Sequence, residues 1–342
     1  MSAIVGHDVA ISEFLTAMRG PRMHHAWLIA GPQGVGKAET ATALAKRLLC
    51  EAAGPDISGD GVDVPESHPI GKLVDAHTHP DFILLDRLPK DMKALRDVER
   101  RDWPRDIERV RNITIDQVRA LGSTFALTPF YSRSRIVLVD AIDDMERSAA
   151  NALLKSLEEP PQGTIFLLVS HAPGRLLPTI RSRCRLLRFE ALADDAMHVA
   201  LRRALPAIDE AELTALVAAG QGSPGRALGY AGLDLAGLDA SLQAIARNGD
   251  ADNALRAALA QSLSGKTAQR RYEAFLMRAP AFIAAEARNR SGRALNAALE
   301  AWSATRSLAE SAVRQSLDPQ MTVFSLGTHI AGLAPGANNA KA

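Results

Sequence analysis

A glycine-rich segment, residues 31–38 (GPQGVGKA), carries the residue types and spacing that most clearly indicate chemistry. It matches G-x-x-x-x-G-K and lies between an apolar run and an alanine-rich helical pattern, the context that a phosphate-binding loop requires. Glycines allow turns that aim successive amides at an anion, and the following helix N-terminus adds partial positive charge. The nucleotide-binding residues predicted here are Gly31, Pro32, Gln33, Gly34, Val35, Gly36, Lys37 and Ala38.

The residue after Lys37 is Ala38, where this loop pattern expects a Ser or Thr whose hydroxyl binds Mg²⁺. Thr40 is a poor substitute, because at about 100° per residue it points to another side of the helix. The sequence therefore predicts that ATP or ADP can bind, gives Mg²⁺ only weak support, and predicts no metal ligands of its own.

A second candidate is Asp140, which ends the apolar run of residues 136–139 and could hold a metal through water. No glutamate follows it directly to orient an attacking water. Asp143 or Asp144 could take that part, or could instead cap the helix predicted over 145–159. No carboxylate pair for two-metal nucleotidyl transfer can be assigned, so no polymerase site is expected.

Short apolar runs position these residues. Residues 26–30, 135–140 and 164–170 predict strands buried on both faces of a parallel sheet, with a helix over 148–159 that ends at two prolines. The expected class for residues 1–189 is α/β, with an insertion at about 50–111.

Beyond residue 190, alanine and leucine dominate at a helical period, which predicts an all-α part. Residues 336–342 are expected to be a flexible tail. One apolar stripe is predicted to be buried in the core or at a subunit interface; its members are Leu295, Leu299, Trp302, Ala309, Val313 and Leu317.

Charge is balanced, with 40 Lys plus Arg against 39 Asp plus Glu, so any nucleic-acid contact is expected to be local. The charged segment 89–111 could be a nucleic-acid patch, but its interleaved signs favour an internally paired face. With two cysteines, no secretory signal and no long apolar run, the sequence predicts a cytoplasmic protein without membrane contact.

Residues 151–161 (NALLKSLEEPP) and 177–184 (LPTIRSRC) resemble the clamp-loader branch of the AAA+ ATPases. Residues 4–7 (IVGH), 78–81 (THPD) and 222–228 (GSPGRAL) extend the resemblance over residues 1–335. It implies a RecA-like P-loop domain, a small helical lid over 190–235, and a helical collar over 236–335 that assembles five subunits.

The resemblance also implies roles for single residues. Arg183 looks like the arginine finger that reaches the ATP of a neighbouring subunit, where a permanent guanidinium charge can stabilise transferring phosphoryl oxygens. A local salt bridge is its alternative reading. Arg226 falls at the lid position that senses γ-phosphate, His171 at a position where active loaders usually carry Asn or Thr, and Val5 and Gly6 are expected beside the nucleotide.

The implied function is a stator subunit of the bacterial DNA polymerase III clamp loader, with weak or absent ATPase of its own. Its implied partners are ATPase (tau/gamma) subunits and a delta subunit in a hetero-pentamer, the sliding clamp, and primer-template DNA without sequence specificity. The alternative is an ATP-hydrolysing motor subunit or stand-alone AAA+ ATPase, which Lys37, Asp140 and Arg226 favour and Ala38 and His171 oppose.

Zinc is not expected. Many members of this family carry four cysteines in an insert near the position of Cys50, but only Cys50 is present here. His68, His77 and His79 do not have the spacing of a zinc ribbon.

Overall fold

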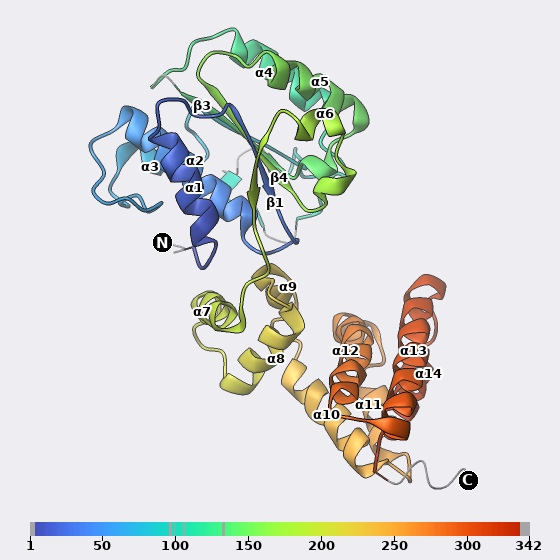
Figure 1. Ribbon diagram of the computed structural model, residues 1–342. Coiled ribbons are helices and arrows are strands. Elements are labelled where there is room, and N and C mark those ends of the chain that lie inside the picture. The colour runs from blue at the N-terminus through green and yellow to red at the C-terminus, as the bar shows by residue number, and fades with distance from the viewer. Residues whose placement is uncertain (1–3, 96–97, 99, 105–106, 132–133, 336–342) are drawn as a thin grey trace. The chain divides into compact units, whose positions relative to one another are not determined.

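The computed structural model describes residues 4–95, 98, 100–104, 107–131 and 134–335 (Figure 1). The chain forms two compact units, one from residues 1–196 with 222–225 and one from residues 197–221 with 226–342. The finer division at residues 189 and 235 stays a prediction. Among the described residues, no helix is long and apolar enough to cross a membrane.

The first unit is built on a five-stranded sheet in the order β2-β3-β4-β1-β5, with every neighbouring pair parallel. The strands are β1 (Ala26–Ala30), β2 (Phe82–Asp86), β3 (Arg135–Asp140), β4 (Thr164–Ser170) and β5 (Arg185–Arg188). The predicted α/β class with a RecA-like sheet is confirmed.

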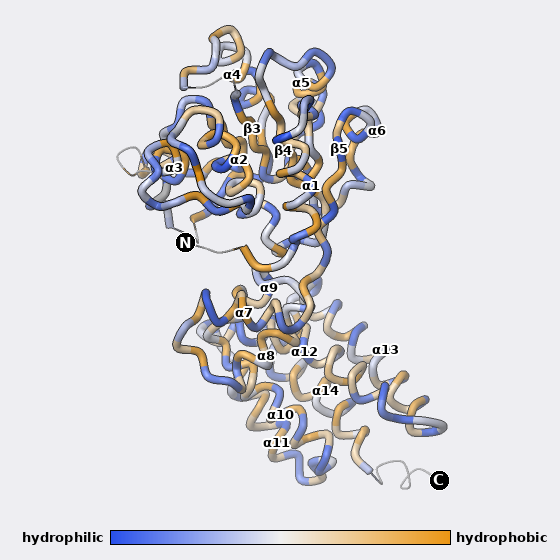
Figure 2. Tube along the Cα trace, turned by 60° about the vertical axis from the view of Figure 1, so that its left-hand side comes forward, coloured by the Kyte–Doolittle hydropathy of each residue, from blue (hydrophilic) through white to orange (hydrophobic). Residues whose placement is uncertain are grey.

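Helices cover both faces of this sheet (Figure 1). On one face lie α1 (Asp8–Met18), α2 (Lys37–Ala53) and α3 (Pro69–Asp75); on the other lie α4 (Ile115–Phe125), α5 (Arg147–Glu158) and α6 (Pro178–Arg181). Successive side chains of a strand point to opposite faces, so Trp27 joins the first core and Leu28 the second. This is why the apolar runs are continuous, as Figure 2 shows for β3 and β4.

The range predicted as an insertion differs in the structure, because β2 lies inside it and pairs with β3. Its apolar run, Phe82 to Leu85, is short and stands between two aspartates, so the pattern alone does not separate it from a loop. Around it lie α3, which begins at the N-cap residue His68, and a single 3₁₀ turn, Arg100–Asp102.

The described part of the second unit contains helices and no strand, as predicted. Its elements are α7 (Asp194–Ala204), α8 (Glu210–Gly220), α9 (Pro224–Gly229), α10 (Leu235–Asn248), α11 (Ala254–Ser262), α12 (Gln269–Arg288), α13 (Gly292–Gln315) and α14 (Pro319–Ala331); α7 and α9 begin within the first unit.

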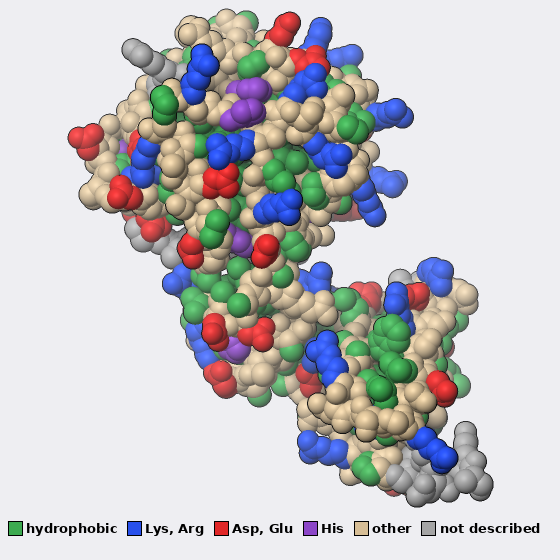
Figure 3. Space-filling model, viewed as in Figure 1, with side chains coloured by type: hydrophobic (Ala, Val, Ile, Leu, Met, Phe, Trp, Pro, Cys, Tyr) green, Lys and Arg blue, Asp and Glu red, His purple; other side chains and the backbone are tan. Residues whose placement is uncertain are grey.

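The stripe predicted on α13 is buried only in part within this chain, and its alternative place at a subunit interface stays a prediction. The buried residues of this helix are small, namely Ala298, Thr305, Ala309 and Ala312, and of these Ala309 belongs to the stripe. Leu299 is exposed, and hydrophobic side chains reach the surface in this unit (Figure 3). Spacing alone could not separate the two faces, because α13 carries apolar residues on both. The side chain of Val313 lies outside the described residues.

Candidate functional site

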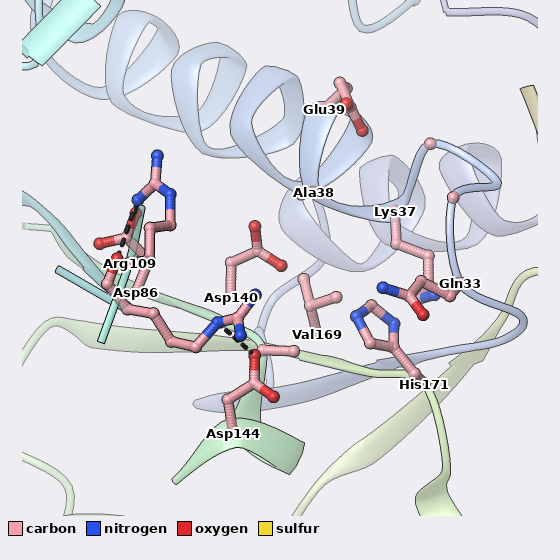
Figure 4. A pocket seen from close by; sticks show the side chains of 14 residues that line it. Gln33, Lys37, Ala38, Glu39, Asp86, Arg109, Asp140, Asp144, Val169 and His171 are labelled. Atoms are coloured by element: carbon pink, nitrogen blue, oxygen red, sulfur yellow. Dashed lines mark hydrogen bonds and ion pairs between the residues drawn. The ribbon is translucent and has the colours of Figure 1, made fainter. Parts of the chain in front are cut away.

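A pocket of about 520 Å³ lies at the carboxyl ends of β2, β3 and β4, beside the N-terminus of α2 (Figure 4). Parallel α/β sheets place their ligand sites at this edge. Of the predicted site residues, the structure brings Gln33, Gly34, Gly36, Lys37, Ala38, Asp140 and His171 to its wall. The other lining residues are Glu39, Asp86, Arg87, Arg109, Ala141, Asp144 and Val169.

Three carbonyl groups of the phosphate loop are held by donors from two other parts of the chain. Ser223 Oγ donates to the Gln33 carbonyl at 2.9 Å, and the Gly225 amide to the Gly34 carbonyl at 2.8 Å. His7 Nε2 lies 2.8 Å from the Val35 carbonyl. We call these three contacts the loop clasp. None of the three donors lines the pocket, so these carbonyls are bonded to groups outside it.

The amide side of the same loop is free. Among the described residues, the backbone N–H groups of Gln33 through Gly36 have no acceptor. Gly34 and Gly36 have φ of 78° and 96°, a region that glycine adopts without strain. Gly31 is required for another reason, since a Cβ there would lie 2.0 Å from the Phe189 carbonyl oxygen. The loop is thus a preformed cradle for an anion.

Lys37 is 3% exposed, and its Nζ donates to the carbonyls of Gly31 at 2.8 Å and Pro32 at 2.5 Å. Desolvation lowers its pKa, against the attraction of Asp143, Asp140 and Glu39. A phosphate near Nζ would restore the stabilisation that burial removes from the ammonium. Lys37 is therefore suited to an anionic ligand.

Asp140 occupies the centre of the pocket, between Asp86 with Arg109 on one side and Lys37 with His171 on the other (Figure 4). Burial raises the pKa of its carboxyl to about 6, and the neighbouring carboxylates of Glu39, Asp86 and Asp144 add to the rise. No ion pair of Asp140 is found within the described part of the chain. Its carboxylate is a charge without a fixed counterion.

The flanking carboxylates, by contrast, are paired with arginines. Arg109 Nη1 donates to Asp86 Oδ2 at 3.0 Å, and Arg100 also contacts Asp86. Arg87 Nε lies 3.1 Å from Asp144 Oδ2. Asp86 is the register partner of Asp140 on the adjacent strand, which explains why these groups meet at one edge.

Asp143 and Asp144 do not cap α5, which begins at Arg147 without a side-chain cap. The Asp143 carboxylate instead accepts from Ser170 Oγ at 3.1 Å, from the His171 amide at 2.7 Å and from the Ala172 amide at 3.0 Å. Asp143 therefore fixes the backbone that presents His171. Desolvation, with Lys37 nearby, lowers the pKa of the His171 imidazole, which favours the neutral ring.

The residues present fit the phosphates of a nucleotide but not a magnesium ion. The loop supplies free amides and Lys37 supplies a cation. Ala38 has no hydroxyl, and two of the three carboxylates at the sheet edge already bind guanidinium groups. Octahedral Mg²⁺ binds carboxylates and hydroxyl oxygens, so a cation here would have to displace an arginine.

The two predicted arginines have other surroundings. Arg183 follows α6 and does not line the pocket; Nη2 lies 2.8 Å from Glu158 Oε1, and Nη1 donates to the Thr179 carbonyl at 2.9 Å. The local salt bridge considered for Arg183 thus exists, and its role in trans stays a prediction. Arg226, in the second unit, donates to Gln221 Oε1 at 2.9 Å.

Val5 and Gly6 do not line the pocket either. Gly6 has φ 75°, and a Cβ on it would lie 2.7 Å from Leu192 Cδ2. Their position next to His7 links them to the loop clasp, and contact with a nucleotide stays a prediction.

Cys50, His68, His77 and His79 are the residues considered above as zinc ligands. Cys50 is fully buried in the core, and His68 caps α3 by accepting from the Gly71 amide. Among the described residues, no group of three His, Cys, Asp or Glu side chains could share a metal ion. That zinc is not bound stays a prediction.

The charged segment 89–111 forms ion pairs, partly within itself, as between Lys90 and Glu108, and partly with Asp86. Five of its charged residues lie outside the described residues, namely Arg96, Asp97, Glu99, Arg105 and Asp106. Sequence reasoning missed Asp86, Arg87 and Arg109 as pocket residues. A signal for Asp86 exists, because it ends a short apolar run as Asp140 does.

Comparison with known proteins finds subunits of DNA polymerase III, both in a family model and among curated relatives. A family model described as "DNA polymerase III, delta subunit" matches residues 6–193. The chain is 36% identical over 200 residues to DNA polymerase III subunit delta' of Pseudomonas aeruginosa, a match over 58% of this chain and 53% of that protein. It is 28% identical over 225 residues to subunit gamma/tau of Mycobacterium bovis, over 65% of this chain and 34% of that protein.

The match therefore spans about half the length of the curated delta' relative and about a third of the length of the gamma/tau relative. Among solved structures, a DNA polymerase III gamma subunit-related protein from Thermotoga maritima resembles it with a TM-score of 0.47 at 15% identity, covering 94% of this chain and 99% of that one. That similarity is too low to support a conclusion about function.

Proposed function

The chain belongs to the DNA polymerase III delta-subunit family, and on this premise we propose that it works as a delta-prime-type stator subunit of a bacterial clamp loader. In this role it supplies Arg183 to the ATP site of a neighbouring subunit and helps to place the sliding clamp on primed DNA during replication. Its own pocket holds nucleotide without efficient hydrolysis.

The observation that carries this proposal is the contrast between Arg183 and the chain's own pocket. Arg183 does not line that pocket, and a third of its side chain is exposed on the turn after α6. Glu158 and the Thr179 carbonyl hold the guanidinium in one place, which limits the entropy lost when it meets a partner. A positioned arginine of this kind can stabilise the charge that develops during phosphoryl transfer.

The partners follow from the proposal. We expect a hetero-pentamer with tau/gamma ATPase subunits and a delta subunit, in which the helical residues 236–335 form the collar and 190–235 the lid. Contact with primer-template DNA is expected through phosphates, without base readout. The proposed place of action is the cytoplasm, and polymerase chemistry belongs to other subunits.

The test is steady-state ATPase of a reconstituted loader with clamp and primed DNA. We expect Arg183→Ala to lower turnover about tenfold or more while assembly, measured by gel filtration, stays intact. Glu158→Gln is the matched control, because it removes the salt bridge but leaves the guanidinium; turnover should stay within about twofold. Unchanged turnover with Arg183→Ala would show that the arginine is structural and would overturn the proposal.

A second candidate is an ATP-hydrolysing AAA+ subunit, and the presence of Lys37 and Asp140 in one pocket favours it. The two candidates differ in what the isolated chain does. A motor subunit should hydrolyse ATP alone, lose that activity with Lys37→Ala and keep it with Arg183→Ala. A stator should show no activity above the Lys37→Ala background.

A further inference from the structure

We propose that the pocket binds the phosphates of a nucleoside diphosphate or triphosphate without a divalent cation, with the guanidinium groups of Arg87 and Arg109 supplying the charge that Mg²⁺ supplies in related sites. The inference rests on the nucleotide binding included in the proposed function, but not on the action of Arg183. It concerns how this chain compensates phosphate charge.

The first step is that the oxygen ligands of a cation are missing or engaged. Ala38 offers no hydroxyl oxygen. Asp144 Oδ2 is 3.1 Å from Arg87 Nε, and Asp86 Oδ2 is 3.0 Å from Arg109 Nη1. Asp140 and Glu39 are the lining carboxylates without an ion pair in the described part of the chain, but no hydroxyl oxygen lies beside Lys37 to complete the octahedral set that Mg²⁺ demands.

The second step is that both arginines retain donors for a ligand. Arg109 uses Nη1 for Asp86 and for the Arg87 carbonyl, at 3.0 and 2.8 Å. Its Nε and Nη2, and both Nη atoms of Arg87, have no hydrogen-bond partner within the described part of the chain. Since a guanidinium carries five N–H donors, each arginine can hold its carboxylate and still donate to a phosphate oxygen.

The third step is position and charge. Arg87 and Arg109 line the same pocket as Lys37 and the loop residues Gln33, Gly34 and Gly36. Because Asp86 and Asp144 are held in ion pairs, they repel a phosphate less than free carboxylates would. Lys37 and the loop amides can hold one end of a polyphosphate while the arginines hold the other.

The experiment is titration calorimetry of the full chain with ADP and with ATP, each in excess Mg²⁺ and in EDTA. We expect the wild-type Kd in EDTA to be equal, within about twofold, to that in Mg²⁺, or lower. Arg87→Gln and Arg109→Gln should each weaken binding in EDTA about tenfold, the effect of one charge-assisted hydrogen bond. Arg119→Gln, on the exposed face of α4, is the matched control and should bind as the wild type does.

Further variants separate lost contact from lost folding. Arg109→Lys keeps a cation and should bind between wild type and Arg109→Gln, with an unchanged circular dichroism spectrum. Adding Ala38→Thr to the two Gln substitutions should create a preference for Mg²⁺. Binding that is tenfold weaker in EDTA than in Mg²⁺, or glutamine variants that bind like wild type, would overturn the inference.

Failure of this inference can be told apart from failure of the proposed function. If no nucleotide binds under any condition while Arg183→Ala still stops the reconstituted loader, the inference is wrong and the stator role stands. If nucleotide binds in EDTA and Arg183→Ala leaves the loader unchanged, the stator role is wrong and the inference on phosphate binding stands.

Discussion

The two sides of the pocket are built differently. On the loop side, backbone carbonyls are held by Ser223, Gly225 and His7, and the amides of residues 33–36 have no acceptor among the described residues. On the sheet side, Asp86 and Asp144 are engaged by arginines, and Asp140 is left without a counterion. The loop side has kept the geometry of an anion site, whereas the sheet side lacks that of a metal site.

This difference teaches that phosphate binding and metal binding depend on separate parts of a P-loop domain. The cradle depends on backbone conformation, which glycines and distant hydrogen bonds maintain. The metal site depends on a few side-chain oxygens, which single substitutions or added arginines remove. A chain can therefore lose metal-assisted chemistry while the loop stays intact.

The largest expected effect comes from breaking the loop side at Gly31. In Gly31→Ala the new Cβ would lie 2.0 Å from the Phe189 carbonyl oxygen, so backbone must move. We expect the free energy of unfolding to fall by about 3 kcal/mol or more, measured by urea denaturation.

The matched control for that substitution is Gly122→Ala on α4, where a Cβ meets no atom within 4 Å. Alanine in a helix should raise stability by up to about 1 kcal/mol. Equal stability of the two variants would show that the loop is not tightly packed. The loop side of the pocket could then no longer be described as a rigid anion site.

The next effect comes from the sheet side at Asp140. Its carboxyl has a pKa of about 6 in the folded chain, above the ordinary value of 3.8, so ionisation disfavours folding. We expect Asp140→Asn to raise the free energy of unfolding at pH 7 by on the order of 1–3 kcal/mol. Thermal or urea unfolding of both chains at pH 7 measures the gain.

The raised pKa of Asp140 determines how the stability gain of Asp140→Asn depends on pH. Well below pH 3.8 the carboxyl is protonated in both states and the substitution should change little; the gain should grow as the pH rises from 3.8 to about 6 and level off above that. Asp56→Asn, at an exposed position, is the control. A gain that is constant across this range would mean that neither burial nor the neighbouring carboxylates raise the pKa of Asp140 in the folded chain.

A smaller effect is expected at the loop clasp. Ser223 is 2% exposed and its Oγ donates to the Gln33 carbonyl, so Ser223→Ala removes one buried hydrogen bond. The free energy of unfolding should fall by about 1 kcal/mol, and nucleotide affinity should fall with it. Ser123→Ala, at an exposed helical site, should do neither. Loss of stability without loss of affinity would show that the clasp does not shape the cradle.

The smallest effect is expected at the Arg183 salt bridge. The two side chains are 33% and 48% exposed, and exposed ion pairs contribute little. Glu158→Gln should change the free energy of unfolding by less than about 0.5 kcal/mol in moderate salt. A larger loss would assign Arg183 to holding the fold, and would weaken the case for its action in trans.

The sequence was sufficient for the features that depend on neighbouring residues. The phosphate loop, the strand that ends at Asp140, and the helical second half all follow from local patterns. The buried face of α13 did not, because spacing alone could not show that small residues such as Ala298 and Ala312 pack inward while Leu299 stays outside.

The arginine pairs could not be read from the sequence for a different reason. Asp86 meets Asp140 only through strand register, and Arg109 reaches Asp86 from 23 residues away. The loop clasp is more distant still, since nothing in residues 31–38 indicates which donors will hold their carbonyls. Such contacts are set by topology and not by local pattern.

The loop clasp also has a consequence for biosynthesis. Ser223 is 190 residues from the carbonyl that it holds. At about 5–20 residues per second, the ribosome adds that length in roughly 10–40 s. During this interval the nascent chain already contains the whole phosphate loop but not Ser223 or Gly225. The nucleotide cradle is therefore completed late, and a chain interrupted before residue 222 would leave the ribosome with the Gln33 and Gly34 carbonyls unclasped.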